Sequence, residues 1–183
     1  MREEFIKCRV ERANPGTDWE NTWRLARLPG LGPDNTSFLL RVIHQLLPTK
    51  ERVARTRLNA NSSCKALGCQ ENVEEGLTHA LIYCQGNDRV GINLLEGLRG
   101  VQPGVQADAA LRLEFQVEEQ LELPMVWLTA CVLRTIWNLR LSNTRVRHYV
   151  VRSKLEAEIN ILRETRHGHA VPQIIELAEN LLS

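Results

Sequence analysis

The sequence contains no long hydrophobic stretch. No apolar run approaches the roughly 20 residues that a helix needs to cross a bilayer. The first residues, MREEFIKCRVER, are charged and lack the apolar segment of a secretory signal peptide. We therefore expect an intracellular protein, in the nucleus or the cytoplasm, with no membrane partner. Cysteines stay reduced in those compartments, so the five cysteines favour metal binding over disulfide bonds.

Motifs of the common enzyme classes are missing as well. The sequence has no P-loop, no Gly-x-Ser-x-Gly and no visible pairing of a cysteine nucleophile with a histidine base. The His-x-Glu and Pro-Cys-x-x-Cys pattern of the zinc deaminases is also absent. The sequence therefore predicts a protein that is not itself an enzyme.

Aromatic residues are scarce, at 5% of the chain, whereas leucine is frequent throughout the 183 residues. This composition argues against a β-sandwich and predicts helices that pack on helices. The apolar fraction of 43% and the charged fraction of 25% are typical of a soluble globular protein.

Charge is distributed unevenly along the chain, although the net charge is only +1. Residues 1–70 and 125–183 carry an excess of basic side chains, and residues 71–124 carry an excess of acidic ones. Two basic ends can form an electrostatic footprint for nucleic acid. Charged faces that are merely solvated explain the same distribution equally well.

Four metal-ligating residues stand in the pattern C-x4-C-x9-H-x4-C: Cys64, Cys69, His79 and Cys84. Three cysteines and one histidine form a closed ligand set for a structural, tetrahedral zinc ion. The first pair lies in a stretch rich in Asn, Ser and Gly, which predicts a loop. Gly68 precedes the second cysteine and can adopt the positive φ that such a loop needs. The sequence thus predicts a structural Zn²⁺ site.

The second ligand pair is expected at the end of a short helix. Positions five apart in an α-helix point about 140° away from each other, so we place His79 within the helix and Cys84 at its end. The acidic residues between the two pairs, Glu71, Glu74 and Glu75, are expected at the surface rather than as ligands. The alternative is that the three cysteines are simply buried as small apolar residues. That is our expectation for Cys8 and Cys131.

Helix signals divide the rest of the chain. Asp18, Asp34, Thr49 and Asp88 are predicted to cap helices. Residues 59–76 are predicted as loop, residues 108–121 as either helix or strand, and Pro124 is expected to begin a central apolar helix. The final expected segments are 144–166 and 172–182. We expect an all-α, mainly helical fold in which a zinc ion holds one loop in place. This expectation allows one short pair of strands. The predicted domains are a helical zinc-binding module, 1–87, and a C-terminal helical bundle packed on it, 88–183.

Two stretches of the chain resemble the C-terminal region of a non-LTR (LINE-type) retrotransposon polyprotein. The first, WENTWRLARLPGLGPDNTSFLLRVIHQLLPTKERVAR with the Cys/His cluster that follows, is similar to the zinc-binding segment after the reverse-transcriptase domain. The second, ELPMVWLTACVLRTIWNLR with LEAEINILRETR, is similar to the C-terminal tail of such elements. The polymerase motif Tyr-x-Asp-Asp is absent, so the resemblance implies an accessory piece beside a preceding reverse-transcriptase domain. It would hold RNA or target DNA during target-primed reverse transcription.

Basic residues around the zinc motif are the candidate contacts to nucleic acid: Lys50, Arg52, Arg55, Arg57 and Lys65. Further candidates lie on the later helices: Arg134, Arg140, Arg145, Arg147, Arg152 and Lys154. Phosphate contacts of this kind give binding that ignores sequence and weakens with salt.

The alternative function is a helical interaction module in which zinc only staples a loop. Its partner would be another protein, or a second copy of the chain through the apolar helix 124–142. The acidic middle segment favours this alternative because it would repel phosphate. Gathering of the arginines on one face would favour nucleic acid instead.

Overall fold

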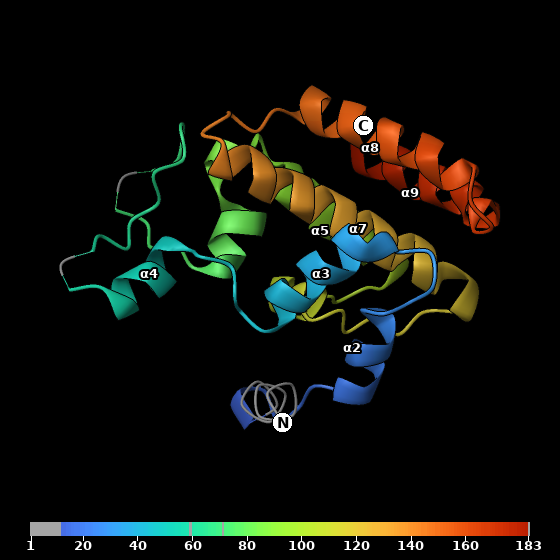
Figure 1. Cartoon of the computed structure of the whole chain (residues 1–183), viewed down its shortest axis with the longest axis horizontal. Helices are drawn as coiled ribbons and strands as arrows, with labels where there is room; N and C mark the ends of the chain where they lie inside the picture. Colours follow the sequence, from blue (N-terminus) through green and yellow to red (C-terminus); the bar gives the residue numbers. More distant parts are fainter. Residues whose placement is uncertain (1–11, 59, 71, 183) are drawn as a thin grey trace.

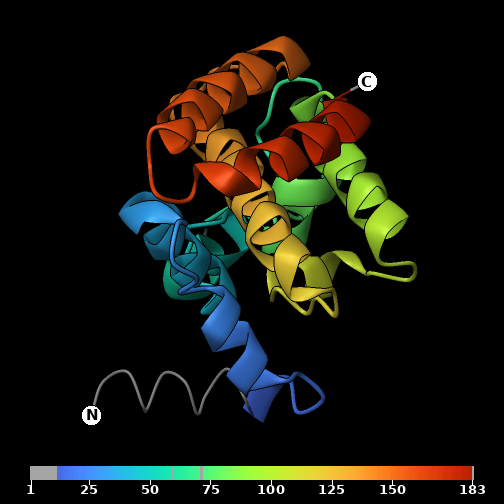
Figure 2. The same ribbon diagram turned by 90° about the vertical axis from the view of Figure 1, so that its right-hand side faces the viewer.

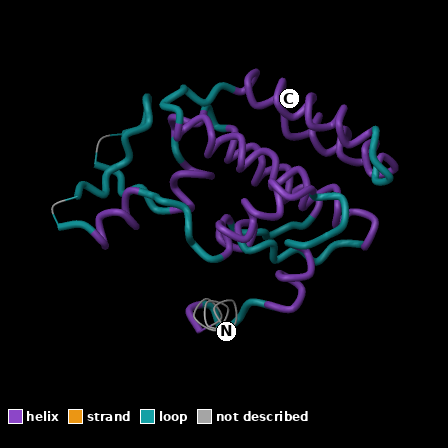
Figure 3. Tube along the Cα trace, viewed as in Figure 1, coloured by secondary structure: helices purple, strands orange, loops and turns teal. Residues whose placement is uncertain are grey.

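The computed structural model describes residues 12–58, 60–70 and 72–182, and this part of the chain is built from helices and loops (Figure 3). Its helices are α2 (Trp19–Leu25), α3 (Gly32–Ile43), α4 (Lys50–Thr56), η1 (His79–Tyr83), η2 (Gln85–Asn87), α5 (Val90–Val101), α6 (Ala107–Leu111), α7 (Glu119–Leu141), α8 (His148–Arg163), η3 (Gly168–Ala170) and α9 (Val171–Leu182). The described residues form no sheet, and one antiparallel bridge joins Ser63 to Glu74. The prediction of an all-α, mainly helical fold is confirmed.

Helix α7 runs through the middle of the molecule (Figure 1). It contacts α2, α3, α5, η1, α8 and α9. Every residue from Pro124 to Leu133 is buried, as expected for a helix that is apolar almost all round. Figure 2 shows α8 and α9 on one side of α7 and α3 on another. The expected central helix is therefore confirmed.

Within the described residues, no helix is both long enough and apolar enough to span a membrane.

The start of α7 differs from the prediction. The helix begins at Glu119, and Pro124 lies inside it instead of opening it. A proline within a helix removes one backbone hydrogen bond. Pro124 is buried together with the apolar residues that follow it, and this packing offsets the loss. The preceding segment, predicted as helix or strand, forms α6 and then a turn in which Leu113 has a φ of 57°.

Two of the four predicted helix caps are present. The Asp18 side chain accepts a hydrogen bond from the Asn21 backbone N–H at 3.0 Å, and Thr49 accepts one from Arg52 N–H at 3.3 Å. The prediction for Asp34 is wrong, because α3 begins at Gly32 and this aspartate lies in its first turn. Pro33 explains the earlier start, since its fixed φ suits the first turn of a helix.

The fourth cap is made to a different helix. Asp88 and Arg89 both have left-handed backbone conformations, so α5 begins only at Val90. The Asp88 carboxylate instead accepts a hydrogen bond, at 3.1 Å, from the backbone N–H of His148, the first residue of α8. This contact links the predicted boundary at residues 87 and 88 to the C-terminal helices. Buried residues of both halves belong to one hydrophobic cluster, and the division into two domains stays a prediction.

Candidate metal centre

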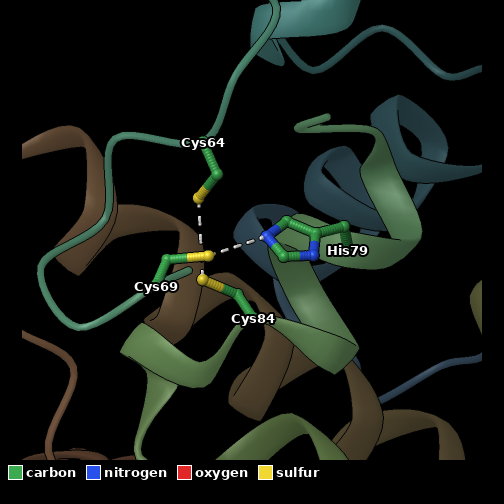
Figure 4. A group of neighbouring side chains, drawn as sticks. All are labelled: Cys64, Cys69, His79 and Cys84. Carbon is green, nitrogen blue, oxygen red and sulfur yellow. Dashed lines mark hydrogen bonds between the residues drawn. The ribbon is translucent and has the colours of Figure 1, made fainter. Parts of the chain in front are cut away.

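The four predicted ligands meet at one point (Figure 4). One ligand atom from each of Cys64, Cys69, His79 and Cys84 lies within 4.8 Å of all the others. The Sγ atoms of Cys64 and Cys84 are 3.7 Å apart, and Cys69 Sγ lies 3.4 Å from His79 Nε2. The prediction that these residues lie together is confirmed, and their arrangement could bind a metal ion.

A short pinched loop brings the first two cysteines into place. The Cys64 backbone N–H donates to Val73 O and the Glu75 N–H donates to Ser62 O, both at 2.8 Å, so the two ends of the loop pair. Between them Gly68 has a φ of 85°, and the Cys69 N–H donates to Ala66 O at 3.0 Å. The expected positive φ at Gly68 is confirmed, and the resulting turn directs Cys69 back toward Cys64.

A π-helical turn, η1, presents the second pair. The Cys84 N–H donates to His79 O at 2.8 Å, a hydrogen bond between residues five apart. In an α-helix this spacing would separate the side chains by about 140°, but the wider π turn brings residues five apart closer to the same side of the helix. Cys84 directly follows the last residue of η1, as predicted, and both side chains reach the same site.

Arg140, at the end of α7, reaches into the centre from outside the sequence motif. Its guanidinium donates to Cys84 Sγ at 3.2 Å and to Cys64 Sγ at 3.4 Å. It also forms a salt bridge of 2.5 Å with Glu75, and each of these two side chains is only 9% exposed. Hydrogen bonds of this kind orient metal ligands and stabilise negative charge on sulfur.

Two sequence expectations are wrong at this point. Glu75 was expected at the surface and is buried, because its carboxylate is held by Arg140. Arg140 was a candidate for contact with nucleic acid, but its side chain is engaged with the thiols and with Glu75. No pattern in the sequence marks this pair, because the two residues are 65 positions apart and lie in different elements.

Burial controls the protonation of the free ligands. It raises the pKa of the Cys69 thiol to about 12, and the nearby Cys84 and Cys64 add to the effect. Burial also raises the pKa of Cys84, against the opposing influence of Arg140. The pKa of His79 is lowered by burial and by the positive charge of Arg140, which favours the neutral imidazole that binds metals. A metal ion would therefore displace protons from the thiols as it binds.

Glu75 also fastens the basic helix α4 to the centre. Its carboxylate accepts a hydrogen bond from the Lys50 backbone N–H at 3.1 Å, and its carbonyl oxygen accepts one from Glu51 N–H at 3.2 Å. The first turn of α4 is thus held against the residue that binds Arg140. Lys50, at the start of α4, is consequently attached through Glu75 and Arg140 to the candidate metal centre.

The five candidate contacts to nucleic acid fall into two groups. Arg52 donates to the backbone oxygen of Gln45, and Arg55 pairs with Glu51. The remaining three, Lys50, Arg57 and Lys65, are exposed and form no ion pair with any residue that the structure describes.

The later candidates are also divided. Arg134 pairs with Asp34 and Glu158, and Arg152 pairs with Glu156, so neither is an unengaged cation. Arg145 is exposed and lines a groove of about 450 Å³ together with Lys50 and Lys65. The remaining lining residues are Pro48, Ala66, Leu67, Glu75, Gly86, Asn87, Trp137, Arg140, Leu141, Asn143, Thr144 and Val146.

One further cysteine of the described residues, Cys131, lies apart from this centre. Cys131 is buried inside α7, as expected, where it accepts a hydrogen bond from the Asn35 amide at 3.3 Å. Its pKa is raised to about 12 by burial. Cys8 lies outside the described residues.

Comparison of the chain with protein-family models gives no match, and searches of the curated proteins and of the solved structures find no similar protein.

Proposed function

We propose that the centre is a structural zinc site. Three thiols and one imidazole are the ligands that zinc prefers, and they leave no open position for a substrate. Thiolates about 2.3 Å from a tetrahedral ion lie about 3.8 Å apart. The distance of 3.7 Å between Cys64 and Cys84 agrees with that value. A bound zinc ion would hold the loop 64–69 against η1 and contribute to the free energy of folding.

The molecule around this site is, on our proposal, an accessory nucleic-acid-binding module without enzymatic activity. It would hold RNA or target DNA beside a preceding reverse-transcriptase domain of the non-LTR retrotransposon type. The observation that carries the proposal is the position of exposed cations, without an ion pair to any described residue, beside the candidate metal centre. Lys50 begins α4, and Lys65 lies between two of the candidate ligands in the sequence. Cations held on a rigid frame bind phosphates without reading the sequence of bases.

A titration of the zinc-loaded chain with labelled RNA tests this function. We expect binding that is independent of sequence and that weakens steeply between about 50 and 200 mM salt. Absence of binding at the lowest salt concentration would refute the nucleic-acid function while leaving the zinc site intact. Primer extension and nuclease assays on the same preparation should give no product.

A second candidate function is a zinc-stapled module for protein–protein interaction or dimerisation. Two large apolar side chains near the groove favour it, since Leu67 is 67% exposed and Leu141 is 60% exposed. Exposed apolar side chains beside a groove are typical of protein contacts. Sedimentation of the chain as a dimer, together with no affinity for RNA, would support this candidate instead.

A further inference from the structure

Three cations from separate parts of the chain share the groove beside the metal centre. Lys50 begins α4, Lys65 lies in the loop between Cys64 and Cys69, and Arg145 lies in the connection between α7 and α8. All three are exposed, and none forms an ion pair with a residue in the described part of the chain. Their shared place follows from tertiary structure, since nothing in the sequence links Arg145 to the other two.

The acidic group in this groove is already neutralised. Glu75 is the only acidic residue among the described residues that line it, and its carboxylate is bound by Arg140 at 2.5 Å. Three thiolates with a zinc dication would add one negative charge. The three positive charges of the exposed cations outnumber this single negative charge. The groove is therefore positive and favours an anion.

Apolar residues also line the groove. Pro48, Leu67, Trp137 and Leu141 contribute to its lining, and both leucines are largely exposed. A volume of about 450 Å³ lies within the range of pockets that hold small organic ligands. Cations and apolar side chains in one groove match the two parts of a nucleotide, a charged phosphate and a flat base.

We propose that this groove binds a nucleotide unit of a single-stranded nucleic acid. Its phosphates contact Lys50, Lys65 and Arg145, and an unstacked base lies against Leu67 and Leu141. A duplex keeps its bases stacked and paired, and so offers only its phosphates to the groove. This inference rests on the proposed function and names the surface that carries it.

The metal centre builds one wall of the groove. Lys65, Ala66 and Leu67 lie between two ligands, so a bound ion fixes the loop that carries them. The loop also packs tightly on Gly86, where an added Cβ would lie 2.8 Å from Leu67 O and 2.9 Å from Ala66 Cβ. We therefore expect binding at the groove to require the metal, and Gly86→Ala to weaken it by displacing the loop.

Fluorescence anisotropy with a short labelled single-stranded RNA tests the groove on the full, zinc-loaded chain. The variant Lys65→Gln/Arg145→Gln should bind about tenfold more weakly near 0.1 M salt, and the slope of log affinity against log salt should fall by about 1.4, since about 0.7 is expected per phosphate contact. The matched control Arg27→Gln/Arg41→Gln removes two exposed cations outside the groove and should change affinity less than about twofold. Zinc content and circular dichroism should be unchanged in both variants.

A third variant tests the contact with the base separately from the contacts with the phosphates. Leu141→Ser alters an exposed side chain, so the fold should be retained. It should lower affinity for single-stranded RNA with no change in the salt slope, because it removes apolar contact and no charge. Affinity for duplex RNA should not change.

Three results would overturn the inference. If the wild type binds RNA and Lys65→Gln/Arg145→Gln binds equally well, the groove is not the site, and the proposed function stands on other cations. If poly-glutamate displaces RNA more strongly than unlabelled RNA does, the groove takes an acidic protein segment. If the wild type binds no RNA at all, the proposed function fails and the groove inference fails with it.

Discussion

Arg140 and Glu75 form a buried salt bridge of 2.5 Å that joins the last turn of α7 to the loop of the metal centre. The same guanidinium donates to the thiols of Cys64 and Cys84. One side chain therefore binds a buried carboxylate and two candidate metal ligands at once. The central helix and the metal site are coupled through this arginine, although they are far apart in the sequence.

Removing the arginine should weaken both the metal site and the fold. In Arg140→Gln, zinc affinity should fall about 10- to 100-fold, which is the usual effect of replacing a residue that hydrogen-bonds to a metal ligand. The free energy of unfolding should fall by about 3 kcal/mol, because Glu75 is left buried without its cation. A competition titration with a chromophoric chelator and unfolding in urea measure the two effects.

The double variant Glu75→Gln/Arg140→Gln isolates the ion pair. It removes both buried charges, so the loss of stability should be smaller than the sum of the two single variants. Additive losses would show that the two side chains act independently. Arg57→Gln, which changes an exposed arginine without a described ion pair, serves as the control and should leave both quantities unchanged.

Substitution of the cysteines should separate metal ligands from core residues. Cys69→Ser should abolish equimolar zinc and destabilise residues 45–90, because metal affinity contributes to the free energy of folding. Cys131→Ser should retain one zinc per chain and act only through packing, since this thiol is buried within α7 away from the centre. Elemental analysis and hydrogen exchange compare them. Equal zinc loss in both variants would contradict the assignment of the ligands.

The contact between Asp88 and His148 should stabilise α8. Asp88→Ala removes the acceptor for the first N–H of that helix and leaves alanine in a left-handed conformation. We expect a loss of about 1 kcal/mol, the usual value of a helix cap. Asp88→Asn keeps a carbonyl acceptor and tolerates the same backbone, so it should change stability little. Unfolding in urea measures the stability of both variants and of the wild type. Equal stability of all three proteins would show that this contact does not stabilise α8.

The thiol of Cys131 should be unreactive in the folded protein. Burial raises its pKa from 9.0 to about 12, so about one molecule in 10⁴ carries the thiolate at pH 8, and alkylation requires the thiolate. Peptide mapping after treatment with iodoacetamide should find Cys131 modified only in urea. Because the folded pKa is raised, the related stabilisation is complete below pH 9 and is lost as the pH rises toward 12. Modification of the native protein at pH 8 would contradict this burial.

Local interactions explain why much of the fold followed from the sequence. Helix α7 was expected because its apolar residues leave no polar face, and α4 because Thr49 caps it. The errors at the helix starts have a local cause for Asp34, because Pro33 opens α3 earlier, and a distant cause for Asp88, which bonds to α8. Asp34 and Asp88 were expected to cap the helices that follow them. The first lies inside the first turn of α3, and the second caps α8 instead.

The sequence by itself determined the four candidate metal ligands and the mainly helical fold. Ligand chemistry depends on residue type, and helix formation on nearby apolar periodicity and caps, so both can be read locally. Only the tertiary structure decided that η1 is a π turn, that Arg140 binds the thiols and Glu75, and that Arg145 joins Lys50 and Lys65 at one groove. The contacts of Arg140 and Arg145 join residues far apart in the chain, and they arise from the packing of buried surfaces, which no local pattern encodes.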